Sequence, residues 1–418
     1  MQLLIACSAF ALTVTLAVGR PRLWSGLRVS PASAAVAGML CLMLAGTVRP
    51  GDLVTAIEAL WRPLLTIVAI MITTAAAQQI GVIDRVADRL LAPRIGSVPA
   101  LFRGVFVLSL ATASLLSNDA AILLLTPLVL AFVRSTYPDE PRLLVPFAFA
   151  VFMAAGVAPF VTSNPMNMVV ASYVGLNFNQ YAATMLPVAL AGSMLSFVLI
   201  RRVFAAELAA PARPAARGAA RAPFSAAQKQ MLALLAGVTA TYPLIALFDG
   251  SAIWAVAGIG ALSAAWLAWR DGRERPATLL RRGVAWDVLI FLPAVFVLSI
   301  GLRHVGLVDL LASWYKDGGV GLVGATAALG SAALNNHPMA LVNMLALDAG
   351  LDTRPFLAAL IGGDLGPRLL PTGSLAGLLW LESCRQFGVH VSPGRFIRVG
   401  VVLTIPTLAL SLALLAFF

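Results

Sequence analysis

The feature that most constrains this chain is a succession of apolar runs, each long enough to cross a lipid bilayer. A membrane-spanning helix needs about 20 apolar residues, and runs of that size recur from one end of the sequence to the other. Sixty per cent of the residues are hydrophobic, 11% are charged, and the mean hydropathy is +0.92. An average soluble domain has about a quarter of its residues charged. The chain is therefore predicted to be an all-α polytopic membrane protein.

Ten spans and two apolar hairpins are predicted. The spans lie near residues 1–18, 30–47, 54–79, 142–180, 182–204, 229–248, 251–270, 284–303, 354–386 and 393–417, of which 142–180 and 354–386 are interrupted. The hairpins lie near 98–134 and 319–350. The distal arm of the second, 338–349, would be about 18 Å long, too short for a bilayer core of about 30 Å. Both hairpins are predicted to be re-entrant, although the longer arms of the first would also allow two full spans.

The distribution of Lys and Arg predicts the orientation. If the loop after the first span is cytoplasmic, 23 of the 29 basic residues lie in cytoplasmic segments, five lie outside, and Arg368 lies within an interrupted span. Such a bias is typical of cytoplasmic loops, and it accounts for the net charge of +11 without a nucleic-acid partner. The first run precedes its basic cluster, which favours a retained span over a signal peptide. Both termini are predicted to be periplasmic, in a bacterial inner membrane.

A polar linker divides the chain near its middle. Residues 207–228 are rich in Ala, Pro and Arg, and they separate 1–206 from 229–418. Each half is predicted to contain five spans and one hairpin in the same order. An odd number of spans makes the second half insert with the opposite orientation, which is the inverted-repeat plan of many secondary transporters.

Four polar breaks interrupt the apolar runs at corresponding positions of the two halves. "LSNDAAIL" (116–123) aligns with "LNNHPMAL" (334–341), and "APFVTSNPMNMV" (158–169) with "GPRLLPTGSLAGLL" (366–379). Irregular backbone at membrane depth is tolerated only where it is buried in protein or lines a cavity. Matched breaks of this kind point to a substrate site near the midplane, so we expect the four breaks to converge.

The breaks supply side chains that both donate and accept hydrogen bonds. The candidate substrate-binding residues are Ser117, Asn118, Ser163, Asn164, Asn167, Asn335, Asn336, Thr372 and Ser374. Each of them, taken singly, is equally well explained as the cap of the half-helix that follows it. The matching of the four breaks favours a binding site.

Two carboxylates and one histidine at membrane depth are candidates for proton coupling. Asp119 and Asp364 stand in or beside breaks, where a charged carboxylate costs about 2.5–3.5 kcal/mol and desolvation disfavours the charged form. The alternative for Asp119 is a helix cap, and the alternative for Asp364 is an ion pair with Arg368. His337 is the third candidate because imidazole titrates near neutral pH; its alternative is a structural role at a helix start.

The same segments resemble the signatures of the bacterial arsenite efflux permeases, which belong to the ion transporter superfamily. The similar stretches are "SNDAAILLLTP", "TSNPMNMVVASYVGLNFNQYA", "LNNHPMALV" and "IGGDLGPRLLPTGSLAGLLWL". The resemblance implies inverted repeats, re-entrant hairpins and broken helices. It also implies export of arsenite and antimonite, as neutral As(OH)₃ or Sb(OH)₃, in exchange for protons, with no cofactor. Some members of the family work with a cytosolic arsenite-stimulated ATPase.

Two positions depart from the family pattern. Gly363 stands where the family often has Cys, and His337 stands where an apolar residue is common. The three cysteines, Cys7, Cys41 and Cys384, lie outside the breaks, so they cannot form the thiolate cage that a soft metalloid would favour. A metalloid substrate would therefore be held through its hydroxyl groups.

Other functions are weaker explanations of the sequence. A sodium/proton or other ion antiporter of the same superfamily remains an alternative, because Asp119 and backbone carbonyls can hold Na⁺. The same carboxylate would repel a dicarboxylate substrate. The chain has no HExxH or GxSxG motif, and its three histidines have no metal-binding spacing, so an enzyme is disfavoured. Two inverted halves with broken helices favour alternating access over a passive channel.

Overall fold

The computed structural model describes residues 1–22, 28–215, 223–347 and 352–418. Within these ranges the regular elements are helices, apart from an isolated bridge between Arg22 and Arg28. Eight described helices are long and apolar enough to cross a membrane by length and composition. The prediction of an all-α polytopic membrane protein is confirmed. The middle of the predicted linker, 216–222, lies outside the described residues.

Helices occur at each of the ten predicted spans. The continuous ones are α1 (Gln2–Gly19), α2 (Pro31–Leu44), α3 (Pro50–Ile80), α9 (Phe178–Val203), α11 (Ala226–Ile245), α12 (Ile253–Arg270), α14 (Trp286–His304) and α19 (Pro393–Leu415). The two interrupted ones are pairs of half-helices, α7 (Leu144–Ala154) with α8 (Pro165–Tyr173) and α17 (Arg354–Leu365) with α18 (Leu375–Gln386). Each half-helix is about 14–18 Å long, roughly half of a bilayer core. The breaks between them therefore lie near mid-depth.

The two hairpins are α5 (Val98–Leu115) with α6 (Asn118–Thr136), and the second part of α15 (Leu307–Leu334) with α16 (Asn336–Ala346). With 11 residues, α16 is too short to cross a membrane. The longer α5 and α6 meet the length criterion for full spans. Their tip, however, is bonded to the first helix break, since Asn118 Nδ2 donates to the Gly156 carbonyl over 3.1 Å. The bond holds the tip at the break between two half-helices, as expected for a re-entrant hairpin. Residues 348–350 of the predicted second hairpin lie outside the described ranges.

Several short elements connect the spans or lie within the two helix breaks. They are α4 (Val82–Leu91), α10 (Ala205–Ala209) and α13 (Pro276–Gly283), with five 3-10 helices: η1 (Ala92–Arg94), η2 (Pro141–Leu143), η3 (Val161–Ser163), η4 (Gly366–Arg368) and η5 (Pro371–Gly373). The first part of α15 is also a connector. It ends at Gly319, whose φ of 60° and ψ of −174° favour glycine.

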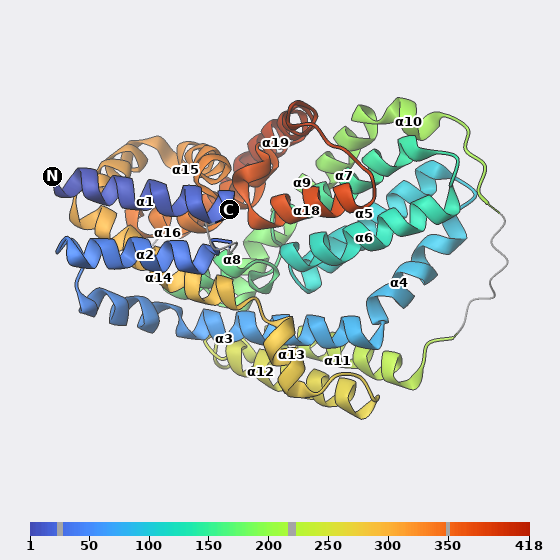
Figure 1. The fold of residues 1–418 in the computed structure, drawn as a ribbon, viewed down its shortest axis with the longest axis horizontal. Helices are drawn as coiled ribbons and strands as arrows, with labels where there is room; N and C mark the ends of the chain where they lie inside the picture. The colour runs from blue at the N-terminus through green and yellow to red at the C-terminus, as the bar shows by residue number, and fades with distance from the viewer. Residues whose placement is uncertain (23–27, 216–222, 348–351) are drawn as a thin grey trace.

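The helices pack in corresponding pairs. α2 lies against α14 as α12 lies against α3, and α5 lies against α7 as α15 lies against α17. The elements α3 and α14 also contact each other, as do α9 and α19. Figure 1 shows α1, α2, α3, α12 and α14 on the left and lower side, and α5, α6, α7, α9 and α10 at the upper right.

Among the described residues there are three hydrophobic cores, and each broken helix joins two of them. One of these two contains α8 and α17 with α1, α2, α3 and α14. The other contains α7 and α18 with α5 and α6, where Trp380 packs against Phe149 and Phe152. The breaks therefore lie where the two cores meet.

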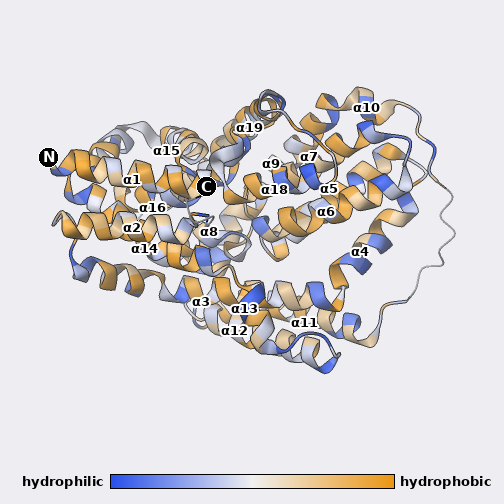
Figure 2. Cartoon of the chain, viewed as in Figure 1, coloured by the Kyte–Doolittle hydropathy of each residue, from blue (hydrophilic) through white to orange (hydrophobic). Residues whose placement is uncertain are grey.

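Large apolar side chains also cover the outside of the molecule. Leu262 on α12 is 75% exposed and Ile259 is 67% exposed, and Figure 2 shows hydrophobic residues along the outer helices. Isolated exposed apolar residues are normal on soluble proteins, but a continuous cover is not. This surface fits a surrounding lipid phase.

Candidate functional site

Each of the four breaks is followed by a helix whose N-terminus has a polar cap. The capping residue accepts a hydrogen bond from a backbone N–H of the following turn, at distances of 3.0 to 3.4 Å; the four are Ser117, Asn164, Asn335 and Ser374. Asn335 adopts a φ of 78° and a ψ of 147°, a positive-φ conformation outside the left-handed helical region that is rare for residues other than glycine. The capping role considered as an alternative is therefore confirmed for these four residues. Capping uses the side-chain oxygen, so it leaves each hydroxyl or amide hydrogen available for another partner.

The first break is held by a carboxylate from the second half of the chain. Asp364 Oδ1 accepts from Asn164 Nδ2 over 2.6 Å, and Oδ2 accepts from the Ala158 backbone N–H over 2.9 Å. Asn167 Nδ2 lies 3.4 Å from the same Oδ2 and donates to the Tyr181 hydroxyl over 2.6 Å. That hydroxyl donates in turn to the Ala158 carbonyl over 3.1 Å. The two breaks thus converge, and Asp364 is their cross-link.

Tyr181 is part of this network although the sequence did not single it out. Its side chain is fully buried in α9, and a buried Tyr usually finds a hydrogen-bond partner. The sequence offered one signal that could have identified it, which is a tyrosine that follows a polar helix break closely in the chain.

Arg368 does not form the ion pair with Asp364 that was considered as an alternative. The described ion pairs do not include these two residues. Instead, Arg368 Nη2 donates to the Met153 carbonyl over 2.6 Å, and Nη1 lies 3.3 Å from Ser196 Oγ. Residues four apart face each other only on a continuous α-helix. Because α17 ends at Leu365 and Arg368 lies in η4, the guanidinium turns to the first broken helix.

A cavity of about 700 Å³, which we call the main cavity, lies beside the breaks. Four predicted site residues line it: Ser117, Asp119, His337 and Ser374. Thr162 and Met168, from the first break, line it too. They were not predicted, although both fall within the quoted segment 158–169. Arg20, Arg282 and Asp287 also belong to its lining.

The other predicted residues lie outside the lining of the main cavity. They are Asn118, Ser163, Asn164, Asn167, Asn335, Asn336, Asp364 and Thr372. Several of them hold the breaks together: Ser163 Oγ, for example, donates to the Ser114 carbonyl over 2.6 Å, which joins η3 to the first hairpin. These residues shape the site around the smaller set that faces the cavity.

The two aspartates differ sharply in their surroundings. Asp364 is 8% exposed and accepts three hydrogen bonds. Asp119 lines the main cavity and is partly exposed. In the part of the chain that the structure describes, its carboxylate has no hydrogen-bond or ion-pair partner, so it does not cap the helix that it begins.

The second hairpin tip carries unused hydrogen-bonding atoms. His337 is 3% exposed, and its Nε2 has no partner among the described residues; the same holds for Asn336 Oδ1. His337 Nδ1 lies 3.4 Å from Asn335 Oδ1, and the ring meets the Phe291 ring edge to face. Buried polar atoms without partners are rare in folded proteins. His337 lines the main cavity, so this tip is suited to receive a polar ligand.

Comparison with known proteins gives consistent matches over the full chain. A family model described as "Arsenical pump membrane protein" matches residues 5–418. The arsenical pump membrane protein of Escherichia coli (strain K12) is 30% identical over 436 aligned residues, which cover 99% of this chain and 98% of that relative. The arsenical pump membrane protein of Yersinia enterocolitica is 30% identical, with the same coverage.

A solved structure has the same overall fold. The crystal structure of the Alcanivorax borkumensis YdaH transporter superimposes with a TM-score of 0.60. The match covers 100% of this chain and 97% of that chain, at 18% sequence identity. At this identity the similarity establishes the fold alone.

Proposed function

The chain belongs to the family of arsenical pump membrane proteins, and from that premise we propose that it exports As(OH)₃ and Sb(OH)₃ from the cytoplasm in exchange for protons. Its family and fold make it a multi-pass membrane transporter of arsenicals. The proposal adds the chemical form of the substrate, the direction of transport and the coupling ion.

The observation that carries the proposal is the free carboxylate of Asp119 in a cavity shared with hydroxyl groups. Ser117 and Ser374 line the same cavity, and each retains a hydroxyl hydrogen because its oxygen accepts the capping bond. As(OH)₃ is a neutral polyol whose O–H groups donate to a carboxylate and whose oxygens accept from serine. None of the three cysteines, all in described ranges, lines the cavity, which supports binding through hydroxyls.

Proton coupling follows from competition for Asp119. A carboxylate oxygen that accepts an As–OH hydrogen bond cannot hold a proton at the same position. Substrate and proton therefore compete for that oxygen, and each weakens the binding of the other, which is negative coupling between two ligands of one site. In the proposed cycle, Asp119 releases its proton to the cytoplasm before arsenite binds, and it is protonated from the periplasm as arsenite leaves.

Asp364 is less suited to this role. Three N–H donors already bond to its carboxylate, so only one of its about four lone-pair sites is left for a proton or a substrate. We propose that Asp364 stays charged and holds the two breaks together, whereas Asp119 gains and loses a proton in each transport cycle. His337 then serves as a ligand through its free Nε2.

The orientation is proposed from charge. Arg20 and Arg282 line the main cavity and belong to the segments that the positive-inside bias predicts to be cytoplasmic. The main cavity would then open to the cytoplasm, with both termini in the periplasm of a bacterial inner membrane. The paired packing of α2 with α14 and α12 with α3 supports a division into inverted repeats at 1–206 and 229–418, on either side of the linker 207–228.

Inside-out membrane vesicles test the function. With an inward-acidic pH gradient, vesicles that contain the protein should accumulate As(III), and nigericin with K⁺ should abolish the accumulation. Uptake that survives collapse of the gradient would rule out proton exchange. Sodium-driven proton movement in the absence of arsenite would instead favour the sodium/proton antiporter, whose Na⁺ would also bind at Asp119.

A further inference from the structure

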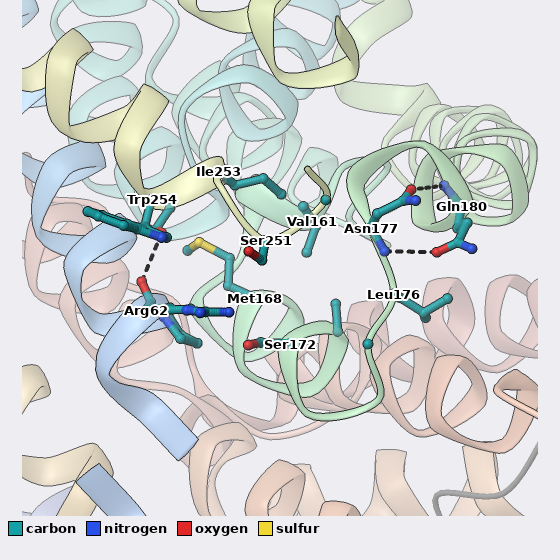
Figure 3. Close-up of a pocket in the computed structure, with 15 residues that line it drawn as sticks. Arg62, Val161, Met168, Ser172, Leu176, Asn177, Gln180, Ser251, Ile253 and Trp254 are labelled. Atoms are coloured by element: carbon teal, nitrogen blue, oxygen red, sulfur yellow. Dashed lines mark hydrogen bonds between the residues drawn. The ribbon is translucent and has the colours of Figure 1, made fainter. Parts of the chain in front are cut away.

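A second pocket lies on the other side of α8 from the main cavity. We call it the Arg62 pocket; its volume is about 410 Å³. Figure 3 shows Arg62 and Trp254 on one side of it and Asn177 and Gln180 on the other, with Met168 between them. The polar side chains that line it are Arg62, Thr66, Ser172, Asn177, Gln180 and Ser251.

The barrier between the two cavities is thin. Met168 lines both of them. On α3, Thr66 lines the Arg62 pocket while the next residue, Ile67, lines the main cavity. In η3, Val161 lines the Arg62 pocket and Thr162 lines the main cavity. At three places, therefore, one residue or one peptide step separates the two spaces.

We propose that the Arg62 pocket is the site from which the neutral hydroxide leaves the protein, and that Met168 closes it off from the main cavity. This proposal rests on the proposed function for the identity of the solute and on the predicted orientation for the direction. It goes further by assigning the exit route and the residue that blocks it.

The chemistry of the pocket suits a small neutral polyol. The side-chain oxygens of Asn177 and Gln180 accept each other's backbone N–H groups, at 2.9 Å in both cases, so both amide NH₂ groups remain as donors. The Ser172 hydroxyl is exposed and both donates and accepts. The Arg62 guanidinium, 5.1 Å from the centre of the Trp61 ring, adds a positive charge. An arginine beside a pathway repels cations and protons but not an uncharged solute.

The position of Met168 suits a movable barrier. It belongs to α8, a half-helix of nine residues, whereas Thr66 belongs to α3, the longest helix described. Methionine is unbranched and flexible at its side-chain bonds, so a small shift of α8 against α3, with a change of rotamer, would join the two spaces. The cross-link from Asp364 to the residues before α8 ties this movement to the second broken helix.

Cysteine accessibility in oriented vesicles tests the proposal without requiring transport. All reporter variants are made in the full chain after its three native cysteines have been replaced, by Cys7→Ser, Cys41→Ser and Cys384→Ala. Ser172→Cys reports on the Arg62 pocket, and Gln78→Cys, which is exposed in the main cavity, reports on the other side. The probe is the membrane-impermeant, anionic sulfonatoethyl methanethiosulfonate, which Arg62 does not repel, added without arsenite.

Opposite sidedness is expected for the two reporters. Ser172→Cys should react faster from the periplasmic side and Gln78→Cys from the cytoplasmic side, each by about tenfold or more if one state dominates. Met168→Ala should then let the probe reach Gln78→Cys from the periplasmic side. Equal reaction of both reporters from the same side, or no effect of Met168→Ala on a folded protein, would overturn the proposal.

A transport arm separates this proposal from the proposed function. Attachment of a bulky maleimide to Ser172→Cys should lower As(III) export by about tenfold or more. The label would fill the pocket through which the solute is proposed to leave. The same label on Ser313→Cys, an exposed residue on α15 remote from the pocket lining, should leave export unchanged. Export that persists after labelling of Ser172→Cys would refute the proposed exit route but not the proposed function. Correct sidedness without any As(III) export would refute the proposed function and leave the barrier intact.

Discussion

Asn164 Nδ2 donates to Asp364 Oδ1 over 2.6 Å, although the two residues are 200 positions apart in the chain. Asn164 also caps α8, since its Oδ1 accepts from the Met166 backbone N–H. One amide therefore fixes the start of a half-helix in the first half of the chain and binds a carboxylate from the second. The two breaks are mutually dependent, and removal of either partner should affect both.

Asp364→Asn should destabilise the protein. The asparagine side chain places an NH₂ group where the carboxylate had an acceptor oxygen. At least one of the donors from Asn164, Asn167 and Ala158 therefore loses its partner. Each buried donor left without a partner costs about 1–3 kcal/mol. The measurement is the apparent melting temperature in detergent, followed by size-exclusion fluorescence. Asp119→Asn is the matched control, because the Asp119 carboxylate has no described partner; an equal loss in both variants would contradict the cross-link.

Asp119→Asn should fold normally and lose proton-driven transport. The amide cannot take up or release a proton, but it still accepts a hydrogen bond from an As–OH group. We therefore expect As(III) exchange down its own gradient to persist, while accumulation driven by a pH gradient falls to the level of empty vesicles. Asp139→Asn, in an exposed loop, is the control for a lost carboxylate. Full proton-driven accumulation by Asp119→Asn would clear this residue of a coupling role.

The sequence predicts the spans well because length and apolar composition determine them locally. The ten predicted spans and both hairpins have counterparts in α1 to α19, and the breaks fall at the predicted segments. The connectors α4 and α13 were missed, because short polar-faced helices carry no such signal and resemble loops in composition.

The contacts at the site are harder to predict than the breaks themselves. The spacing of Asp364 and Arg368 left an ion pair open as an alternative, but the change from α17 to η4 turns the two side chains apart. The bonds from Asp364 to Asn164 and Ala158 join distant parts of the chain, and no local pattern encodes them. Which of the predicted polar residues face the cavity likewise depends on packing between the two cores.

Gly400→Ala should be strongly destabilising. A Cβ at Gly400 would lie 1.9 Å from the Arg368 carbonyl oxygen, a backbone atom of η4 that cannot move independently. Relief of this contact requires α19 to move away from the second break, and overpacking of this kind typically costs about 1–3 kcal/mol or more. The measurement is again the apparent melting temperature in detergent.

Gly237→Ala is the matched control for that substitution. Gly237 is also in a helix, α11, but nothing lies within 4 Å of its ideal Cβ position. Alanine is a better helix former than glycine by about 1 kcal/mol, so this variant should melt at the same temperature or slightly higher. Similar melting temperatures for the two variants would mean that Gly400 of α19 does not pack closely against the Arg368 carbonyl of η4.

His337→Leu should make the protein more stable and weaken its affinity for As(III). His337 Nε2 is buried without a partner in the described structure, and leucine removes that desolvated atom, so the melting temperature should rise. Loss of a neutral hydrogen bond to the substrate, worth about 0.5–1.5 kcal/mol, should raise KM for As(III) by about two- to tenfold with kcat unchanged. Vesicle uptake at varied As(III) concentrations measures both constants. Asn343→Leu, on the same helix but outside the lining of the main cavity, is the comparison for KM; its melting temperature should fall, because Asn343 Oδ1 accepts from the buried Tyr315 hydroxyl over 2.6 Å. A higher melting temperature with an unchanged KM would show that the imidazole does not touch the substrate.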